Sequence, residues 1–260
     1  MIDVLQCGRK ASALLLVLML AAPGARAQQA AKIHMHGESG YAADGQLFQP
    51  EGQGPFAALL LVPDEWGVTD RVIAQAKCFA DAGYVVVAID LYRGEIPADS
   101  TQAARLSIEL TEERAQHDLM AAMTFLASQP NVRSGHIAAV GWSTAAARVL
   151  KLAAAASPPL AVVAYACEPP TMPAQTNALT VSVLGIFGGC GRRTSRPAVE
   201  AFEKSLRARG ATVSTTIYPR AANQAAADEP NAQHLSAAEA RDAESRTLGF
   251  LTTELADRSH

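Results

Sequence analysis

The chain has 260 residues, of which 49% are hydrophobic and 18% charged, and its formal net charge at pH 7 is −3. This balance suits one globular domain with a substantial core and argues against disorder and against a coiled coil. The sequence contains no basic run interleaved with aromatic residues, so nucleic acid and anionic membrane surfaces are not expected partners.

The N-terminal segment predicts a secretory signal peptide over residues 1–27. Arg9 and Lys10 precede a largely apolar run over 11–22, and a small-residue cleavage pattern ends at Ala27. The run is short for a membrane span, so we expect cleavage after Ala27 and no membrane attachment afterwards. Cleavage removes three basic residues and one acidic residue, which changes the net charge from −3 to −5. We therefore expect an exported protein, periplasmic or secreted, in a compartment that permits disulfides.

Residues 28–260 predict one domain in which strands alternate with helices. Most of the strands are continuous apolar runs, which are typical of parallel strands buried on both faces. The expected strands are 57–62, 85–90, 136–140, 161–166, 181–187 and 212–218, and the expected helices are 70–82, 112–128, 144–156, 198–209 and 236–255. The order predicts an α/β fold with a doubly wound, mostly parallel sheet and helices on both faces. Any functional site is then expected at the carboxyl ends of the strands.

Residues 137–145 predict a strand that passes through a sharp turn into a helix. The run Ile-Ala-Ala-Val-Gly-Trp-Ser-Thr-Ala places Ser143 in that turn. In such a nucleophile elbow the hydroxyl is exposed above the sheet, at the positive end of the following helix. Ser143 is therefore the candidate nucleophile.

Five segments at the predicted strand ends resemble the dienelactone hydrolase family of α/β-hydrolases. They read DEWG at 64–67, AIDLYRGE at 88–95, VGWS at 140–143, LGIFGG at 184–189 and IYP at 217–219. The resemblance extends from about Ala57 to the end of the chain. It implies a carboxylic ester or lactone hydrolase that acts on a small molecule, and we expect no cofactor. Nothing in the sequence indicates an oligomeric state.

The resemblance also assigns roles to individual positions. Ser143 occupies the nucleophile position, where the family usually has cysteine. The backbone N–H groups of Trp66 and Thr144 correspond to the oxyanion hole. Glu65 matches the glutamate that engages the nucleophile before substrate arrives, and Arg93 lies in the loop that places an arginine near an anionic substrate group.

The remaining triad positions depart from the family pattern. Gly191 stands where the family has the catalytic aspartate, and Asn223 stands where it has the histidine. A serine hydroxyl needs a base to remove its proton, and an asparagine side chain accepts none at a useful pKa. The sequence therefore predicts a hydrolase-family protein that is weak or inactive. The alternative is a non-catalytic protein that binds a small carboxylate, or acts as a scaffold, with the hydrolase pocket retained.

Three replacements for the missing triad members stay open at this point. His234 lies before the last predicted helix, Glu168 follows a predicted strand, and Glu65 is itself a carboxylate. The His34 and His36 pair offers only two ligands on one strand face, so we expect no metal site there.

Two cysteines fall at the carboxyl ends of consecutive predicted strands. These are Cys167 and Cys190, and neighbouring strands lie about 4.8 Å apart, within the range that a disulfide bridges. We consider a disulfide and a pair of reduced thiols as alternatives. Cys78 lies on a predicted helix and is expected to be a small core residue.

Overall fold

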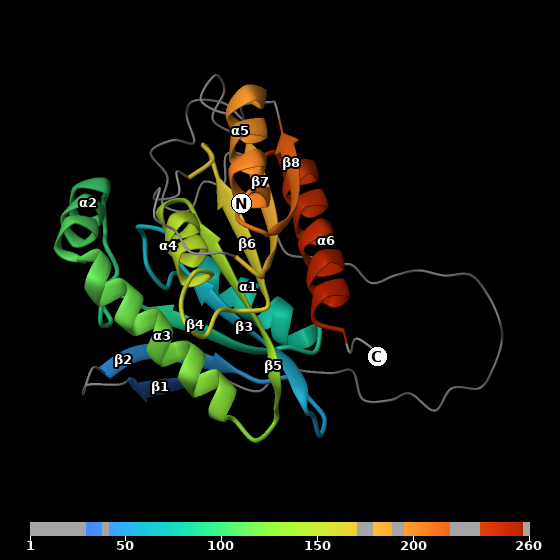
Figure 1. The fold of residues 1–260 in the computed structure, drawn as a ribbon. Helices are drawn as coiled ribbons and strands as arrows, with labels where there is room; N and C mark the ends of the chain where they lie inside the picture. The colour runs from blue at the N-terminus through green and yellow to red at the C-terminus, as the bar shows by residue number, and fades with distance from the viewer. Residues whose placement is uncertain (1–29, 38–41, 171–178, 189–194, 219–234, 257–260) are drawn as a thin grey trace.

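The computed structural model describes residues 30–37, 42–170, 179–188, 195–218 and 235–256, which form one eight-stranded sheet flanked by helices (Figure 1). Its strands are β1 Ala31–His36, β2 Ala42–Phe48, β3 Phe56–Val62, β4 Val85–Asp90, β5 Val132–Trp142, β6 Ala161–Ala166, β7 Ser182–Gly188 and β8 Thr212–Tyr218.

The strand order is β1-β2-β4-β3-β5-β6-β7-β8. The pairs β1–β2 and β2–β4 are antiparallel, and every later pair is parallel. The parallel strands therefore all end at one edge of the sheet, where a doubly wound fold places its sites. The predicted mostly parallel sheet is confirmed.

Helices cover both faces of the sheet, and each parallel strand sends alternate side chains to the two faces. In β3, Ala58, Leu60 and Val62 join one core, while Leu59 and Leu61 join the other. The first core includes buried side chains of α3, α4 and α5, and the second includes those of α1 and α6. The helices are α1 Asp70–Asp81, α2 Ser100–Glu109, α3 Glu112–Ser128, α4 Thr144–Leu152, α5 Arg196–Arg207 and α6 Ala237–Glu254.

Most predicted elements agree with the structure, and the exceptions have a physical reason. The helix predicted over 144–156 ends at Leu152, and the strand predicted from 136 begins at Val132. The sequence did not predict β1, β2 and α2. β1 is an edge strand with most of its residues outside the core, and α2 buries only Ala103 and Leu106, so neither shows a long apolar run.

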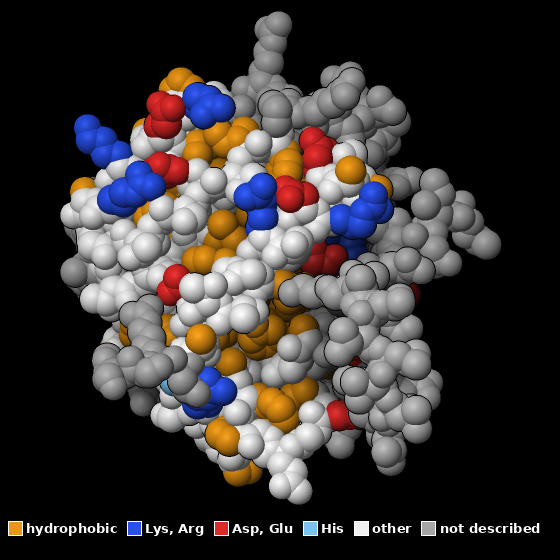
Figure 2. Space-filling view, turned by 90° about the vertical axis from the view of Figure 1, so that its right-hand side faces the viewer, with side chains coloured by type: hydrophobic (Ala, Val, Ile, Leu, Met, Phe, Trp, Pro, Cys, Tyr) orange, Lys and Arg blue, Asp and Glu red, His pale blue; other side chains and the backbone are white. Residues whose placement is uncertain are grey.

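Charged residues of both signs are interspersed on the surface. The face shown in Figure 2 carries Lys and Arg side chains close to Asp and Glu side chains, around exposed apolar areas. Such mixing is typical of an ordinary solvated surface. Within the described ranges, no helix combines the length and the apolar character that crossing a membrane requires.

Candidate active site

Ser143 makes the turn between strand and helix by itself. β5 ends at Trp142 and α4 begins at Thr144, so Ser143 is the single residue between the strand and the helix. Its φ of 53° and ψ of −118° are values that a residue with a side chain rarely adopts. The Ser143 N–H donates to the Tyr165 carbonyl oxygen at 2.8 Å, and the residue is exposed. The backbone therefore holds the serine in the strained conformation of a nucleophile elbow.

Small side chains let α4 approach β5 closely beneath the elbow. A Cβ atom added to Gly141 would lie 2.7 Å from the Ala145 carbonyl oxygen and 3.0 Å from Val149 Cγ1. Ala145 and Ala146 are fully buried. The contact leaves no room for a larger residue at 141, so the glycine is a requirement of this turn.

Aromatic packing supports the elbow from the side of β6. The Trp142 ring stacks on Tyr165, with centroids 5.6 Å apart and planes inclined by 17°. The Tyr165 hydroxyl reaches α6, where it lies 2.6 Å from Thr247 Oγ1 and donates to the Ala243 carbonyl oxygen at 3.3 Å. Burial raises the pKa of Tyr165 well above its ordinary value, so this phenol stays protonated. Trp142 and Tyr165 thus act as packing groups that connect the elbow to the last helix.

The loop between β3 and α1 runs beside the elbow. Val62 of β3 is in register with Gly141 of β5, so Glu65 and Ser143 follow neighbouring strand ends. The Oε2 atom of Glu65 is buried, and it has no hydrogen-bond partner within the part of the chain that the structure describes. A buried carboxylate oxygen without a donor is unfavourable, which is typical of a functional group and not of a packing residue.

The two amides expected to form the oxyanion hole differ in their surroundings. Thr144 is exposed at the first position of α4, where a backbone N–H has no carbonyl partner within its own helix. The Trp66 N–H instead donates to Asp64 Oδ1 at 3.0 Å, and Asp64 Oδ2 accepts a bond of 2.9 Å from the Arg71 guanidinium. Sequence reasoning did not predict this contact, because an Asp that precedes a Glu in a loop has many possible roles. One of the two expected donors is therefore engaged by a carboxylate of its own loop.

Arg93 takes part in a network of charged side chains of the protein itself. Its φ is 57°, and its Nη2 donates to Asp118 Oδ1 at 2.8 Å while its Nε lies 4.0 Å from Asp44 Oδ2. The Asp118 side chain is fully buried in α3. The expectation from sequence was a guanidinium directed at an anionic substrate group. The structure places it on two carboxylates of the protein, so its charge is already compensated.

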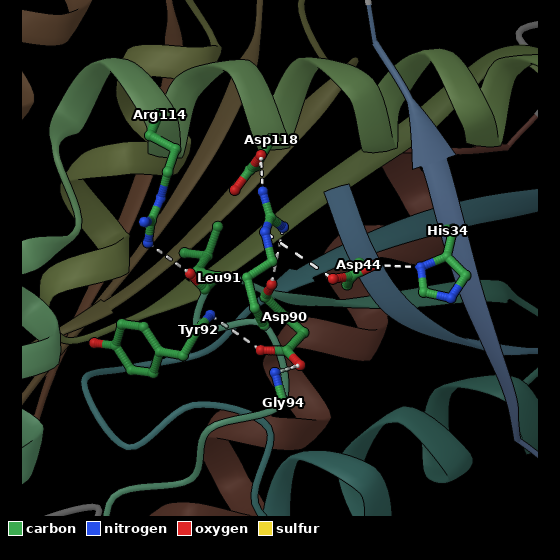
Figure 3. A network of polar contacts seen from close by, with 9 residues as sticks. His34, Asp44, Asp90, Leu91, Tyr92, Gly94, Arg114 and Asp118 are labelled. Carbon is green, nitrogen blue, oxygen red and sulfur yellow. Dashed lines mark hydrogen bonds and ion pairs between the residues drawn. The ribbon is translucent and has the colours of Figure 1, made fainter. Parts of the chain in front are cut away.

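The same network holds the rest of the loop after β4 (Figure 3). The Asp90 carboxylate accepts from the Tyr92 N–H at 3.0 Å and from the Gly94 N–H at 2.6 Å, and Arg114 donates to the Leu91 carbonyl oxygen at 3.0 Å. Asp118 Oδ2 and Arg114 Nε are buried without a hydrogen-bond partner among the described residues. Sequence reasoning missed this cluster, because its members come from a strand end and a helix that only the tertiary fold brings together.

The histidines that the structure describes all lie within strands or helices, and none lies in the loops at the carboxyl ends of the strands. His136 lies in β5, seven residues before Ser143, which is about 23 Å along an extended strand. His34 and His36 belong to β1, four strands from β5, and His34 is hydrogen-bonded to Asp44. His117 lies on α3, with its Nε2 3.9 Å from Glu113 Oε1 of the same helix.

Several predicted positions lie outside the described residues: Gly191, Asn223, His234 and Cys190. Glu168 is exposed after β6. Cys167 is disulfide-bonded, and Cys78 is a half-buried cysteine on α1 that forms no disulfide. The pairing of Cys167 with Cys190 stays a prediction. In the described ranges, no three His, Cys, Asp or Glu side chains gather in a geometry that holds a metal ion.

A serine with positive φ, set between a central strand and the helix that follows it in a mostly parallel sheet, defines an α/β-hydrolase fold. The dienelactone hydrolase family profile matches residues 43–255, and the chain belongs to this family. The family assignment made from the sequence is confirmed.

Two relatives illustrate the range of the match. A protein of Escherichia coli O157:H7 named "Putative carboxymethylenebutenolidase" is 26% identical over 202 residues, which cover 73% of this chain and 74% of the relative. The crystal structure of the dienelactone hydrolase-like promiscuous phosphotriesterase P91, from metagenomic libraries, superposes with a TM-score of 0.74 at 19% identity. That match covers 88% of this chain and 99% of the other. At this identity the likeness concerns the fold alone.

Proposed function

We propose that this protein is an exported member of the dienelactone hydrolase family that keeps the nucleophile elbow but hydrolyses esters or lactones weakly or not at all. The observation that carries the proposal is Ser143. Its backbone is held in the strained elbow conformation, yet none of the histidines that the structure describes lies in the loops at the carboxyl ends of the strands.

Attack by Ser143 requires the removal of its hydroxyl proton. A hydroxyl attacks an ester efficiently only when a neighbouring base accepts its proton in the transition state. The family position for that base is Asn223 in this chain, and the position that would orient it is Gly191. Enzymes that lose triad members keep roughly 10³–10⁴-fold acceleration over water, from the oxyanion hole and binding alone. We expect residual activity of that order or below.

The alternative of a small-carboxylate binder receives less support from the geometry. It depends on Arg93 as the group that holds the anion. Because the guanidinium contacts the buried Asp118 at 2.8 Å, an incoming carboxylate competes with a carboxylate that is already desolvated. Glu65, beside the elbow, adds a further unfavourable charge for an anion.

The test is covalent labelling of the mature protein, residues 28–260, by a fluorophosphonate, together with hydrolysis of p-nitrophenyl acetate. We expect negligible labelling and turnover close to that of Ser143→Ala. The matched variant is Gly191→Asp with Asn223→His, which restores both triad positions and is expected to label faster. Rapid labelling of the wild type that disappears in Ser143→Ala contradicts the proposal.

Export is tested separately by the N-terminus of the protein recovered from a Gram-negative host. We expect the periplasmic fraction to hold a chain that begins at Gln28. Recovery of the uncleaved chain in the cytoplasm contradicts this part of the proposal and leaves the expectation for Ser143 unchanged.

A further inference from the structure

The Asp64 carboxylate connects the loop beside the elbow to the first helix. Its Oδ1 accepts the Trp66 N–H at 3.0 Å, and its Oδ2 accepts the Arg71 guanidinium at 2.9 Å. The side chain of Asp64 is 10% exposed, and that of Arg71 is 30% exposed. Both oxygens therefore have donors in a largely water-excluded place, which makes this contact difficult for an outside group to displace.

The Trp66 N–H has a single hydrogen to donate. An oxyanion hole works when its donors are free to meet the oxygen that becomes negative in the transition state, and losing one donor costs roughly 10²–10³-fold in rate. A carboxylate accepts a stronger hydrogen bond than the neutral carbonyl oxygen of an ester. Asp64 therefore has the advantage over a substrate for this amide.

The charge at this loop also opposes an oxyanion. Asp64 and Glu65 are adjacent carboxylates, and Arg71 is the cation that Asp64 contacts. A negative oxygen that approaches Trp66 meets the Asp64 carboxylate and the buried Oε2 of Glu65. Repulsion adds to the loss of the donor.

We propose that Asp64 is an internal occupant of the oxyanion hole, whose carboxylate takes the Trp66 N–H and leaves Thr144 as the backbone donor at Ser143. This inference rests on the proposed function, in which Ser143 is the reacting group. The occupied Trp66 N–H lowers the reaction rate at Ser143 independently of the replaced triad base. Asp64 acts through the Trp66 amide and is a positioning residue.

Two substitutions distinguish this role from a purely structural one, in which Asp64 only holds the loop in place. Asp64→Asn keeps an oxygen that accepts from the Trp66 N–H and removes the negative charge. Asp64→Ala removes the acceptor and frees the amide. If Asp64 only holds the loop in place, both variants leave the chemistry at Ser143 unchanged. If it occupies the amide, Asp64→Ala gives the larger gain and Asp64→Asn a smaller one.

The experiment uses a Ser143→Cys background, because a thiol ionises without a triad base and gives a measurable reaction. Acylation by p-nitrophenyl acetate forms a thioester, releases p-nitrophenolate and passes through an oxyanion. Alkylation by iodoacetamide forms a thioether, releases iodide and needs no oxyanion donor. The ratio of the two rate constants therefore reports the oxyanion hole and cancels changes in thiol pKa or exposure.

We expect the ratio of acylation to alkylation to rise about tenfold or more in Asp64→Ala. We expect a smaller rise in Asp64→Asn, where the repulsion is gone but the Trp66 N–H keeps an acceptor. Because Asp64→Ala leaves the Arg71 charge without its carboxylate, the double variant Asp64→Ala with Arg71→Leu is measured beside it and is expected to show the same rise. Equal ratios in all variants, or an equal rise in Asp64→Asn, overturn the inference. The Ser143→Cys ratios are independent of wild-type turnover, so failure of the proposed function is seen separately.

Discussion

At the carboxyl edge of the sheet, the functional groups of the elbow and those of the neighbouring loops have different surroundings. At the elbow, backbone geometry alone presents Ser143 to solvent, through a positive φ, a bond from its N–H to Tyr165 and the close packing at Gly141. In the loops after β3 and β4, the polar groups are turned to partners inside the protein, as in the Asp64–Arg71 and Arg93–Asp118 pairs.

The difference shows which features of the site depend on the packing of the core and which do not. The elbow is built into the packing of a central strand on its helix, so losing it disturbs the core. The charged groups of the loops lie outside this packing, and their ion pairs connect the loops to α1 and α3. The protein therefore belongs to a hydrolase family, although the Trp66 N–H and the Arg93 guanidinium are hydrogen-bonded to carboxylates of the protein itself.

The largest expected effect comes from breaking the elbow packing. Gly141→Val places a branched side chain where even a Cβ lies 2.7 Å from the Ala145 carbonyl oxygen. We expect a loss of about 3 kcal/mol or more in the free energy of unfolding, measured by urea denaturation. The matched control is Gly249→Ala in α6, where nothing lies within 4 Å of the added Cβ. It is expected to stabilise by about 0.5–1 kcal/mol, because alanine is the better helix former. A tolerated Gly141→Val would show that α4 can move away from β5.

A smaller loss is expected when the loop network is broken. Asp118→Ala removes the fully buried partner of Arg93. Breaking a buried pair costs about 3–5 kcal/mol, but Arg93 is 34% exposed and water screens its charge, so we expect about 2 kcal/mol. Glu109→Ala, which breaks the exposed Arg105–Glu109 pair, serves as the control and is expected to change stability by less than about 0.5 kcal/mol. Equal effects of the two variants would place Asp118 outside the stabilising network.

The strain at the elbow predicts a gain. Ser143→Gly lets the residue adopt its φ of 53° without a side-chain clash, and we expect about 1 kcal/mol of added stability in thermal or urea unfolding. Ser143→Ala keeps a Cβ and is expected to show no such gain. If glycine gives no advantage over alanine, the strain is not stored at this residue.

The smallest expected effect is a pH dependence at Asp118. Burial raises the pKa of its carboxyl above the ordinary value of 3.8, against the opposing influence of Arg93 and Arg114. The folded protein therefore keeps a proton over a pH range in which the unfolded chain has released it. The resulting contribution to stability is full below pH 3.8 and is lost as the pH rises through the raised pKa.

Asp118→Asn removes this titration without changing the shape of the side chain. We expect the stability difference, wild type minus variant, to fall as the pH rises from about 4 and to become constant at higher pH. Urea denaturation of both proteins across this range measures the difference. A difference that grows with pH would mean that the ion pair with Arg93 outweighs burial.

The sequence alone determined the order of most elements, the mostly parallel sheet, the position of Ser143 in its turn and the family. These follow from local signals: continuous apolar runs for buried strands, and a glycine-flanked serine between a strand and a helix. The edge strand β1, its neighbour β2 and the weakly buried helix α2 were not predicted, because none of them contains a long apolar run.

Only the tertiary structure decided where the charged groups of the loops point. Asp64 and Arg71 are seven residues apart, and Arg93 and Asp118 are 25 residues apart, so their pairing depends on how the loops meet α1 and α3. A hydrogen bond acts over about 3 Å, and sequence spacing does not fix side-chain positions to that precision outside regular elements. The Trp66 amide was therefore placed at the correct strand end by sequence, while its actual partner was set by the fold.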